Sequence, residues 1–233
     1  MKWVVEKELA IRASREAGAY LRAHIRDDQE VLVKEGRDIE IQADRDAEEL
    51  ILRALSGTGH PVLAEESGEH GLIEGDTPYW VVDPLDGTMN FTRNLPICCV
   101  SVALCVGNEP QLGVIYDFNR DECFEASLES GARCNGQPSA VSPLKEPAKA
   151  VLSTGVPAKM SLEGASLDRF VDQLRGFKKV RMIGSAALSL AWVACGRVDI
   201  YSEDAIFFWD VEAGVAIVRA AGGVVELDTS DRA

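Results

Sequence analysis

The stretch Asp83-Pro84-Leu85-Asp86-Gly87-Thr88-Met89-Asn90-Phe91 follows directly on the apolar run Tyr79-Trp80-Val81-Val82. The apolar run has the length and residue types of a buried β-strand. Pro84 cannot donate a hydrogen bond to a neighbouring strand, so we expect the strand to stop at Asp83. Carboxylates placed directly after a buried strand have their backbone anchored in the core. This placement favours a defined binding site over a solvated surface.

Two further acidic groups stand in similar places. Glu65 and Glu66 follow a predicted short strand over residues 61–64, and Asp210 begins a predicted helix over 210–221. We expect these side chains to converge at one edge of a sheet, where their oxygens would suit Mg²⁺. The candidate ligands are Glu65, Asp83, Asp86 and Asp210.

Gly87 and Thr88 favour phosphate, because a tight turn with glycine presents free backbone N–H groups. Each acidic group also has a plain structural explanation: surface acids at 65–66, an Asx-type turn at 83–86, and a favourable helix N-terminal charge at 210. The alternating Asp pattern of a calcium loop is absent, as are the Gly-x-Gly-x-x-Gly and Gly-x-x-x-x-Gly-Lys motifs of nucleotide sites.

Elsewhere the hydrophobic spacing predicts alternating helices and strands. Apolar residues recur at every fourth position from Val5 to Leu21, which indicates a long amphipathic helix. The other expected helices cover residues 47–55, 167–174, 185–195 and 210–221. The expected strands cover residues 31–34, 39–41, 61–64, 79–82, 98–106, 112–116, 151–152, 180–182, 198–201 and 224–227. This mixture is typical of a layered α/β architecture.

The chain of 233 residues has 24 basic and 38 acidic residues, a net charge of −14. Such a surface repels nucleic-acid backbones, so we expect no nucleic-acid partner. No apolar run approaches the roughly 20 residues that span a bilayer, and the N-terminus is too charged for a secretory signal. We therefore expect a cytoplasmic protein with no membrane partner. The six cysteines include no Cys-x-x-Cys pair, which argues against a zinc site.

Three stretches resemble the signatures of the inositol monophosphatase family, part of the lithium-sensitive, magnesium-dependent phosphatase superfamily. They are Ala64-Glu65-Glu66-Ser67, the stretch from Asp83 to Phe91, and Trp209-Asp210-Val211 with Ala221-Gly222-Gly223. The resemblance covers nearly the whole chain. It implies one catalytic domain over 1–233, with an N-terminal α+β part over about 1–140 and a C-terminal α/β part over about 141–233. The implied fold is the αβαβα sandwich of the inositol monophosphatase and fructose-1,6-bisphosphatase type.

The resemblance also implies roles for single residues. Glu65, Asp83 and the main-chain carbonyl of Leu85 would hold one Mg²⁺. A second ion would be held by Asp83, Asp86 and Asp210, and Glu65 would take a third through water. Asp44 resembles the residue that polarises Thr88, which positions the attacking water. The implied catalytic residues are thus Thr88, Asp44 and Glu65. We also expect Asp86 to serve only the metal site, so that its loss would leave the fold intact.

The implied substrate contacts lie around these ligands. The backbone of Gly87 and Thr88 would bind phosphate, and Lys34 resembles a basic residue near it. Glu203 resembles a residue that grips substrate hydroxyls, and Ser185-Ala186 resembles the segment beside that residue. The family often has Glu where Ala220 stands, and its chains usually continue past Leu227 with another strand and a helix.

The expected reaction is magnesium-dependent hydrolysis of a small phosphomonoester, inositol monophosphate to inositol and phosphate, by an activated water. Asn90-Phe91 and Glu203 match that branch. A fructose-1,6-bisphosphatase and a phosphoadenosine phosphatase are the alternatives among enzymes, and a catalytically silent binding or scaffold protein is the alternative outside them. The expected partners are a small phosphorylated polyol or sugar as substrate and, by resemblance, a second copy in a homodimer.

Overall fold

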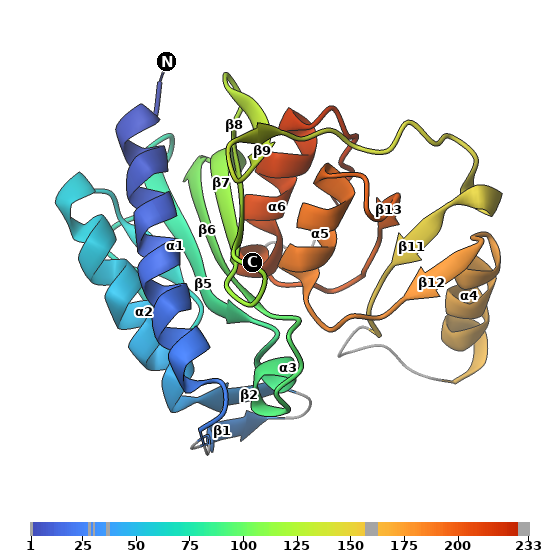
Figure 1. Ribbon diagram of the computed structural model, residues 1–233, viewed down its shortest axis with the longest axis horizontal. Coiled ribbons are helices and arrows are strands. Elements are labelled where there is room, and N and C mark those ends of the chain that lie inside the picture. Colours follow the sequence, from blue (N-terminus) through green and yellow to red (C-terminus); the bar gives the residue numbers. More distant parts are fainter. Residues whose placement is uncertain (1, 28, 30, 36–37, 157–162, 228–233) are drawn as a thin grey trace.

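The computed structural model (Figure 1) describes residues 2–27, 29, 31–35, 38–156 and 163–227. The helices are α1 (Val4–His24), α2 (Gln42–Leu55), α3 (Thr88–Thr92), α4 (Gly164–Arg175), α5 (Ala186–Ala194) and α6 (Phe208–Ala220). The strands are β1 (Val31–Glu35), β2 (Asp38–Ile41), β3 (Val62–Ala64), β4 (Gly68–His70), β5 (Pro78–Asp86), β6 (Cys99–Val106), β7 (Glu109–Asp117), β8 (Glu122–Ser127), β9 (Gly131–Cys134), β10 (Gln137–Pro138), β11 (Val151–Ser153), β12 (Lys179–Arg181) and β13 (Ile200–Tyr201).

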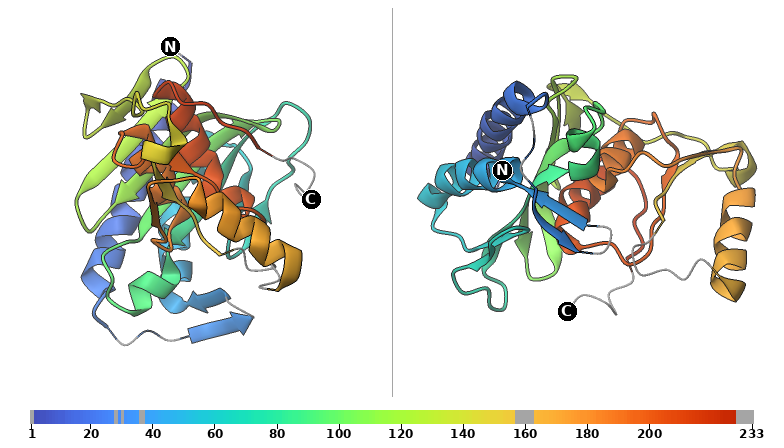
Figure 2. Two further views of the ribbon diagram at one scale, coloured as in Figure 1. Left: turned by 90° about the vertical axis from the view of Figure 1, so that its right-hand side faces the viewer. Right: turned by 90° about the horizontal axis from the view of Figure 1, so that it is seen from below.

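These elements form five alternating layers (Figures 1 and 2). Helices α1 and α2 cover one face of an eight-stranded sheet of order β10-β9-β8-β7-β6-β5-β3-β4, and α5 and α6 cover the other face. Beyond them lie a three-stranded sheet of order β12-β11-β13 and then α4. The expected αβαβα architecture is confirmed. None of the described helices is both long and apolar enough to cross a membrane.

The first core lies between α1, α2 and the large sheet. Ala13, Ala17 and Leu21 of α1 are fully buried, so the second half of the four-residue spacing marks the face that packs, whereas Val5, at its start, is 65% exposed. The predicted hairpin over 31–41 is also present, as the antiparallel pair β1 and β2. Its second strand leads directly into α2.

The second core joins the other face of the sheet to α5 and α6. Helix α6 lies unusually close to β7: a Cβ atom at Gly113 would be 2.2 Å from the carbonyl oxygen of Ala213. Only glycine leaves room for so close a backbone approach. Because α6 carries Asp210 in its first turn, this contact fixes the position of that carboxylate relative to the sheet.

The expectation that the strand stops at Asp83 is wrong. Strand β5 continues through Pro84 to Asp86, and its pairing with β6 shifts in register between Asp83 and Asp86. The shift leaves Pro84 outside the regular ladder, where its missing N–H group costs no hydrogen bond. The amide of Leu85 donates instead to Oδ1 of Asp83, over 2.9 Å. The irregularity thus turns the carboxylates of this strand end away from ordinary sheet geometry.

The strand expected over 224–227 is also wrong: these residues have no regular secondary structure. Gly222, with φ of 87°, ends α6, and the amide of Gly223 donates to the carbonyl of Val218 over 2.9 Å. Val224 is 88% exposed. Among the described residues no strand pairs with this segment, and an apolar run without a pairing partner cannot complete a sheet.

The small sheet is parallel on both sides of β11. Ser153 pairs with Arg181 of β12 and with Tyr201 of β13. Because parallel strands end at the same edge, the residues after β11 and β13 lie side by side. In open α/β sheets that edge is the usual place for a ligand.

Candidate active site

Glu65 and Asp83 are brought together by the parallel pairing of β3 with β5. Ala64 pairs with Val82, and the amide of Glu65 donates to the carbonyl of Val82 over 3.1 Å. Asp83 is 1% exposed, and its Oδ2 atom is buried without a hydrogen-bond partner. A buried carboxylate oxygen left unpartnered is costly, so this atom is suited to a ligand.

Asp86, at the end of β5, contacts the start of α5. Its Oδ2 atom accepts hydrogen bonds from the Ser185 hydroxyl at 2.5 Å and the Ala187 amide at 2.7 Å, while Oδ1 faces the Ala186 amide at 3.3 Å. The expectation that Asp86 serves only a metal site is therefore wrong. The carboxylate also satisfies N–H groups at a helix N-terminus that would otherwise lack partners.

Asp44 and Asp210 occupy the same position in two different helices. Each lies in the first turn, and each accepts a hydrogen bond from the backbone amide just before its helix. The Ile41 amide donates to Asp44 at 2.7 Å, and the Phe207 amide donates to Asp210 at 3.2 Å. Oδ1 of Asp44 is buried without a hydrogen-bond partner. Both carboxylates are thus held by their own helices, with an oxygen atom left over in Asp44.

Burial and mutual repulsion raise the pKa values of the whole carboxylate group. Burial raises the pKa of Glu65 to about 8, and the charges of Glu66, Asp44 and Asp86 add to the rise. Burial also raises the pKa of Asp44 to about 8. The pKa values of Asp83 and Asp210 rise well above the usual range, through burial first and then through the neighbouring carboxylates. A site with so much negative charge calls for a cation.

Gly87 and Thr88 form the turn into α3. Gly87 has φ of 93°, and a Cβ atom there would lie 2.9 Å from the carbonyl oxygen of Ile97, so glycine is required on both grounds. The Thr88 hydroxyl donates to the carbonyl of Leu85 over 3.0 Å. The expected contact between Thr88 and Asp44 is not among the hydrogen bonds of the described residues. The Lys34 backbone lies in β1, and its side chain is outside the described part of the chain.

A pocket of about 170 Å³ opens between the first turns of α5 and α6 and the loops that follow β11 and β13. Five predicted site residues line this pocket: Asp86, Ser185, Ala186, Glu203 and Asp210. The remaining lining residues are Thr154, Gly155, Gly184, Ser189 and Ile206. The first turns of two helices thus face one cavity, and helix N-termini favour anions.

Sequence reasoning missed Thr154, Gly155 and Tyr201. The first two follow β11, and Tyr201 ends β13, where its hydroxyl donates to Oε2 of Glu203 over 3.1 Å. The available signal was their place at the ends of short apolar strands, the same signal that pointed to Glu65. Tyr201 is only two residues from Glu203 in the chain, but without the pairing of β11 with β13 nothing in the spacing puts Thr154 and Gly155 beside Glu203.

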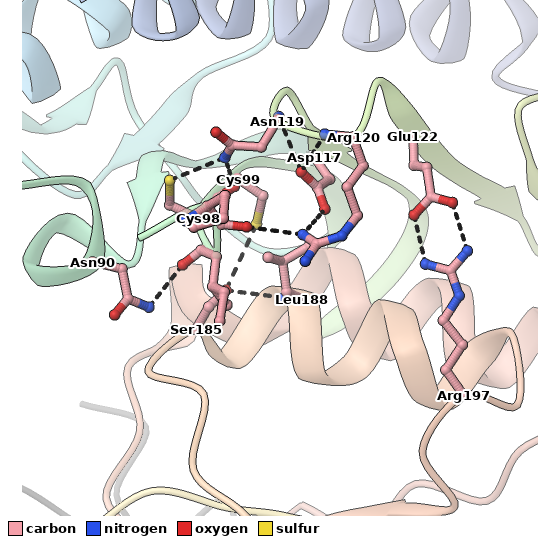
Figure 3. Close-up of polar contacts among 12 residues, drawn as sticks. Asn90, Cys98, Cys99, Asp117, Asn119, Arg120, Glu122, Ser185, Leu188 and Arg197 are labelled. Atoms are coloured by element: carbon pink, nitrogen blue, oxygen red, sulfur yellow. Dashed lines mark hydrogen bonds and ion pairs between the residues drawn. The ribbon is translucent and has the colours of Figure 1, made fainter. Parts of the chain in front are cut away.

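A layer of polar contacts holds the pocket walls (Figure 3). The Asn90 side-chain amide donates to the carbonyls of Ile97 and Ile183, both at 2.7 Å, which ties α3 to the loop before α5. Arg120 forms a 2.8 Å ion pair with the buried Asp117 and lies over the Trp192 ring of α5. The segment that carries Ser185 is therefore fastened to the end of the large sheet.

The donor set fits magnesium. Its members are carboxylates, which are hard oxygen ligands, and Oδ2 of Asp83 is buried without a partner. In the part of the chain that the structure describes, no three His, Cys, Asp or Glu side chains are already gathered as metal ligands. The fit therefore rests on the chemistry of the donors, their shared charge and the unpartnered oxygen.

The profile of the inositol monophosphatase family matches residues 5–230. An inositol-1-monophosphatase of Synechocystis is 39% identical over 224 residues, covering 94% of this chain and 77% of that protein. A protein of Pasteurella multocida named Nus factor SuhB is 38% identical over 225 residues, covering 93% and 83%. The structure of an inositol monophosphatase from Anabaena superposes with a TM-score of 0.84 at 35% identity, covering 95% of this chain and 83% of that one.

Proposed function

The chain belongs to the inositol monophosphatase family, and on this premise we propose that it is a magnesium-dependent hydrolase of inositol monophosphate. The family supports phosphatase activity, and the choice of an inositol phosphate is the proposal. The observation that carries it is the pocket in which Asp86 and Asp210 meet Ser185 and Glu203. That pocket combines carboxylates for a cation, two helix N-termini for an anion and a further carboxylate for hydroxyl groups.

In the proposed mechanism, two or three Mg²⁺ ions would be held by four carboxylates and one carbonyl. These are Glu65, Asp83, Asp86, Asp210 and the carbonyl of Leu85. When bound, magnesium neutralises the phosphate charge, lowers the pKa of a water molecule and stabilises the departing alkoxide. The protein supplies the geometry. Asp86 is fixed by Ser185 and Ala187, and Asp210 by the Phe207 amide, so the carboxylates need little rearrangement.

Thr88 is proposed to orient the attacking water, with Asp44 polarising its hydroxyl and Glu65 nearby as an acid–base group. The assignment requires the Thr88 hydroxyl to turn toward Asp44 from the carbonyl of Leu85, to which it donates over 3.0 Å, and the unpartnered Oδ1 of Asp44 supports it because that oxygen can accept this hydrogen bond. The amides of Gly87 and Thr88 are proposed to bind phosphate oxygens, helped by Lys34. Holding water and phosphorus in line is worth several orders of magnitude in rate.

Glu203 is proposed to accept hydrogen bonds from the hydroxyl groups of the alcohol, with Ser185 and Ala186 beside it. A carboxylate that recognises hydroxyls suits a polyol and gives nothing to an aryl leaving group. This feature favours inositol monophosphate over a phosphorylated nucleoside. A catalytically silent scaffold would not need a buried group of carboxylates with raised pKa values, since such a group costs stability.

The test is phosphate release from a panel containing inositol monophosphate, fructose 1,6-bisphosphate, phosphoadenosine phosphate and p-nitrophenyl phosphate. We expect turnover only with Mg²⁺ and the highest kcat/KM for inositol monophosphate. Highest kcat/KM for the bisphosphate or the nucleotide would move the proposal to that enzyme. No release from any compound at saturating Mg²⁺ would refute it in favour of the silent protein.

A further inference from the structure

The Glu203 carboxylate is held by groups from two strand ends. The hydroxyl of Tyr201, the last residue of β13, donates to Oε2 over 3.1 Å. From the other side, the backbone amide of Gly155, just beyond β11, interacts with the same carboxylate. Burial raises the pKa of Glu203, and these two hydrogen-bonding groups oppose the rise. They therefore favour the ionised form, which accepts hydrogen bonds and donates none.

Gly155 contributes to this arrangement because it has no side chain. A Cβ atom there would lie 2.1 Å from Oε1 of Glu203 and 2.5 Å from its Cδ and Oε2 atoms. The carboxylate therefore occupies the volume that a side chain at 155 would fill, and such a side chain would push the end of Glu203 out of this position. The pairing of Ser153 with Tyr201, and the 3.1 Å bond from the Ser202 amide to the Ser153 carbonyl, keep the two strand ends in this register.

The polar group of the Tyr201 side chain is its hydroxyl, which is used in the hydrogen bond to Glu203. Burial and the neighbouring Glu203 raise the pKa of its hydroxyl well above 10, so the phenol stays protonated and remains a donor. The two residues share one short stretch, since Glu203 lies two residues after Tyr201, the last residue of β13. The carboxylate is thus clamped between a phenol from its own strand and a glycine from the adjacent strand, at the wall of the pocket that also contains Asp86.

We propose that Tyr201 and Gly155 are positioning residues that set the preference for polyol phosphates by fixing Glu203. The inference rests on the proposed function, in which Glu203 contacts substrate hydroxyls. Tyr201 reaches the substrate only through Glu203, and Gly155 acts by leaving room. A clamped carboxylate loses less rotamer freedom on binding than a free one, so its hydrogen bonds contribute more to affinity.

The experiment measures kcat/KM of the full chain, at saturating Mg²⁺, for inositol monophosphate and for p-nitrophenyl phosphate. Tyr201→Phe removes one oxygen atom and keeps the ring. We expect the ratio of the two kcat/KM values, inositol phosphate over aryl phosphate, to fall about 10-fold, as for loss of a hydrogen bond to a charged group. The loss should appear mainly in KM for inositol monophosphate. Gly155→Ala should lower the ratio further.

Tyr79→Phe is the matched control. Its hydroxyl donates to the carbonyl of Gly107 over 2.9 Å, at the opposite end of β5 from Asp86, and the ratio should not change. The double variant Tyr201→Phe/Glu203→Gln gives a second readout. If Tyr201 acts through Glu203, adding Tyr201→Phe to Glu203→Gln lowers the ratio no further.

An unchanged ratio in Tyr201→Phe, an equal fall for both substrates, or additive losses in the double variant would each overturn the positioning role. The proposed function fails in a different way. Wild-type protein that releases phosphate from neither compound would refute the phosphatase, whereas wild-type protein that prefers inositol monophosphate, with Tyr201→Phe retaining that preference, would refute only the inference.

Discussion

The carboxylate of Asp86 accepts a 2.7 Å hydrogen bond from the backbone amide of Ala187, which lies 101 residues further along the chain. The Ser185 hydroxyl reaches the same oxygen at 2.5 Å. The last residue of β5 thereby holds the first turn of α5 against the large sheet. The residue proposed as a metal ligand is therefore also a structural link between the two halves of the pocket.

The first prediction concerns Asp86→Asn, which should abolish turnover and also lower stability. An amide has one acceptor oxygen where the carboxylate has two, and its NH₂ group would face donors from α5. We expect the free energy of unfolding to fall by about 1–3 kcal/mol, measured by urea denaturation of metal-free protein. Asp168→Asn, an exposed position on α4, is the control. Wild-type stability in Asp86→Asn would contradict the capping role, and full activity at saturating Mg²⁺ would contradict the ligand role.

The second prediction concerns pH. Glu65 and Asp44 have folded-state pKa values of about 8, above the value of about 4 for unfolded carboxyls. The folded state then binds more protons than the unfolded state, so stability falls as pH rises from about 4 to 8. The Tm of metal-free protein should thus be lower at pH 8 than at pH 6. Asp44→Asn should reduce the slope by up to about 1.4 kcal/mol per pH unit. A flat profile in the wild type would contradict the raised pKa values.

The third prediction concerns metal removal. Without a cation, the acids around Asp83 give phosphate no positive charge to bind, and they repel it once the pH is high enough to ionise them, because their pKa values are raised. Mg²⁺ should displace their protons and make the local charge positive. Calorimetric titration of inorganic phosphate should therefore show binding to Mg²⁺-loaded protein and little or none in EDTA. Linkage requires phosphate to tighten Mg²⁺ binding by the same factor. Comparable phosphate affinity in both states would mean that Lys34 or another basic group holds the phosphate.

The fourth prediction concerns Gly113→Ala. The added methyl carbon would lie 2.2 Å from the carbonyl oxygen of Ala213, so α6 must move away from β7. Overpacking of this kind costs roughly 1–3 kcal/mol, and displacing α6 shifts Asp210, so kcat should fall as well as Tm. Gly57→Ala is the control, because a Cβ there meets no atom within 4 Å. Unchanged kcat in Gly113→Ala would separate the position of α6 from catalysis.

Much of the fold follows from local patterns in the sequence. The helical spacing from Val5 to Leu21 and the acidic residues after apolar runs are set by neighbours in the chain, and so could be predicted. The apolar run at 224–227 was different. Hydrophobic residues indicate that a segment is buried, but a strand also needs a neighbouring strand to pair with. The sequence of one segment does not say whether such a strand is present.

The site divides in the same way. The placement of Asp83 and Glu65 at neighbouring strand ends could be predicted because each follows a predicted strand. The cap that Asp86 provides depends on Ser185, 99 residues away, and no spacing rule connects the two. Gly155 was missed because its importance lies in the room that it leaves for the Glu203 carboxylate, which becomes visible only when β11 and β13 are paired. The strand end predicted at Asp83 was wrong because a proline interrupts a regular strand, whereas β5 has a register shift at Pro84 and continues to Asp86.

The link between Asp86 and α5 also bears on how the chain is made. Strands β6 to β8 are joined by short turns, and β5 is joined to β6 through α3, so these strands can pair before the helices that cover one face of their sheet, α5 and α6, are synthesised. At translation rates of about 5–20 residues per second, the interval between Asp86 and Ala187 lasts roughly 5–20 s. During that time the nascent sheet exposes an apolar face, and the Asp86 carboxylate at its border has no hydrogen bonds from the start of α5.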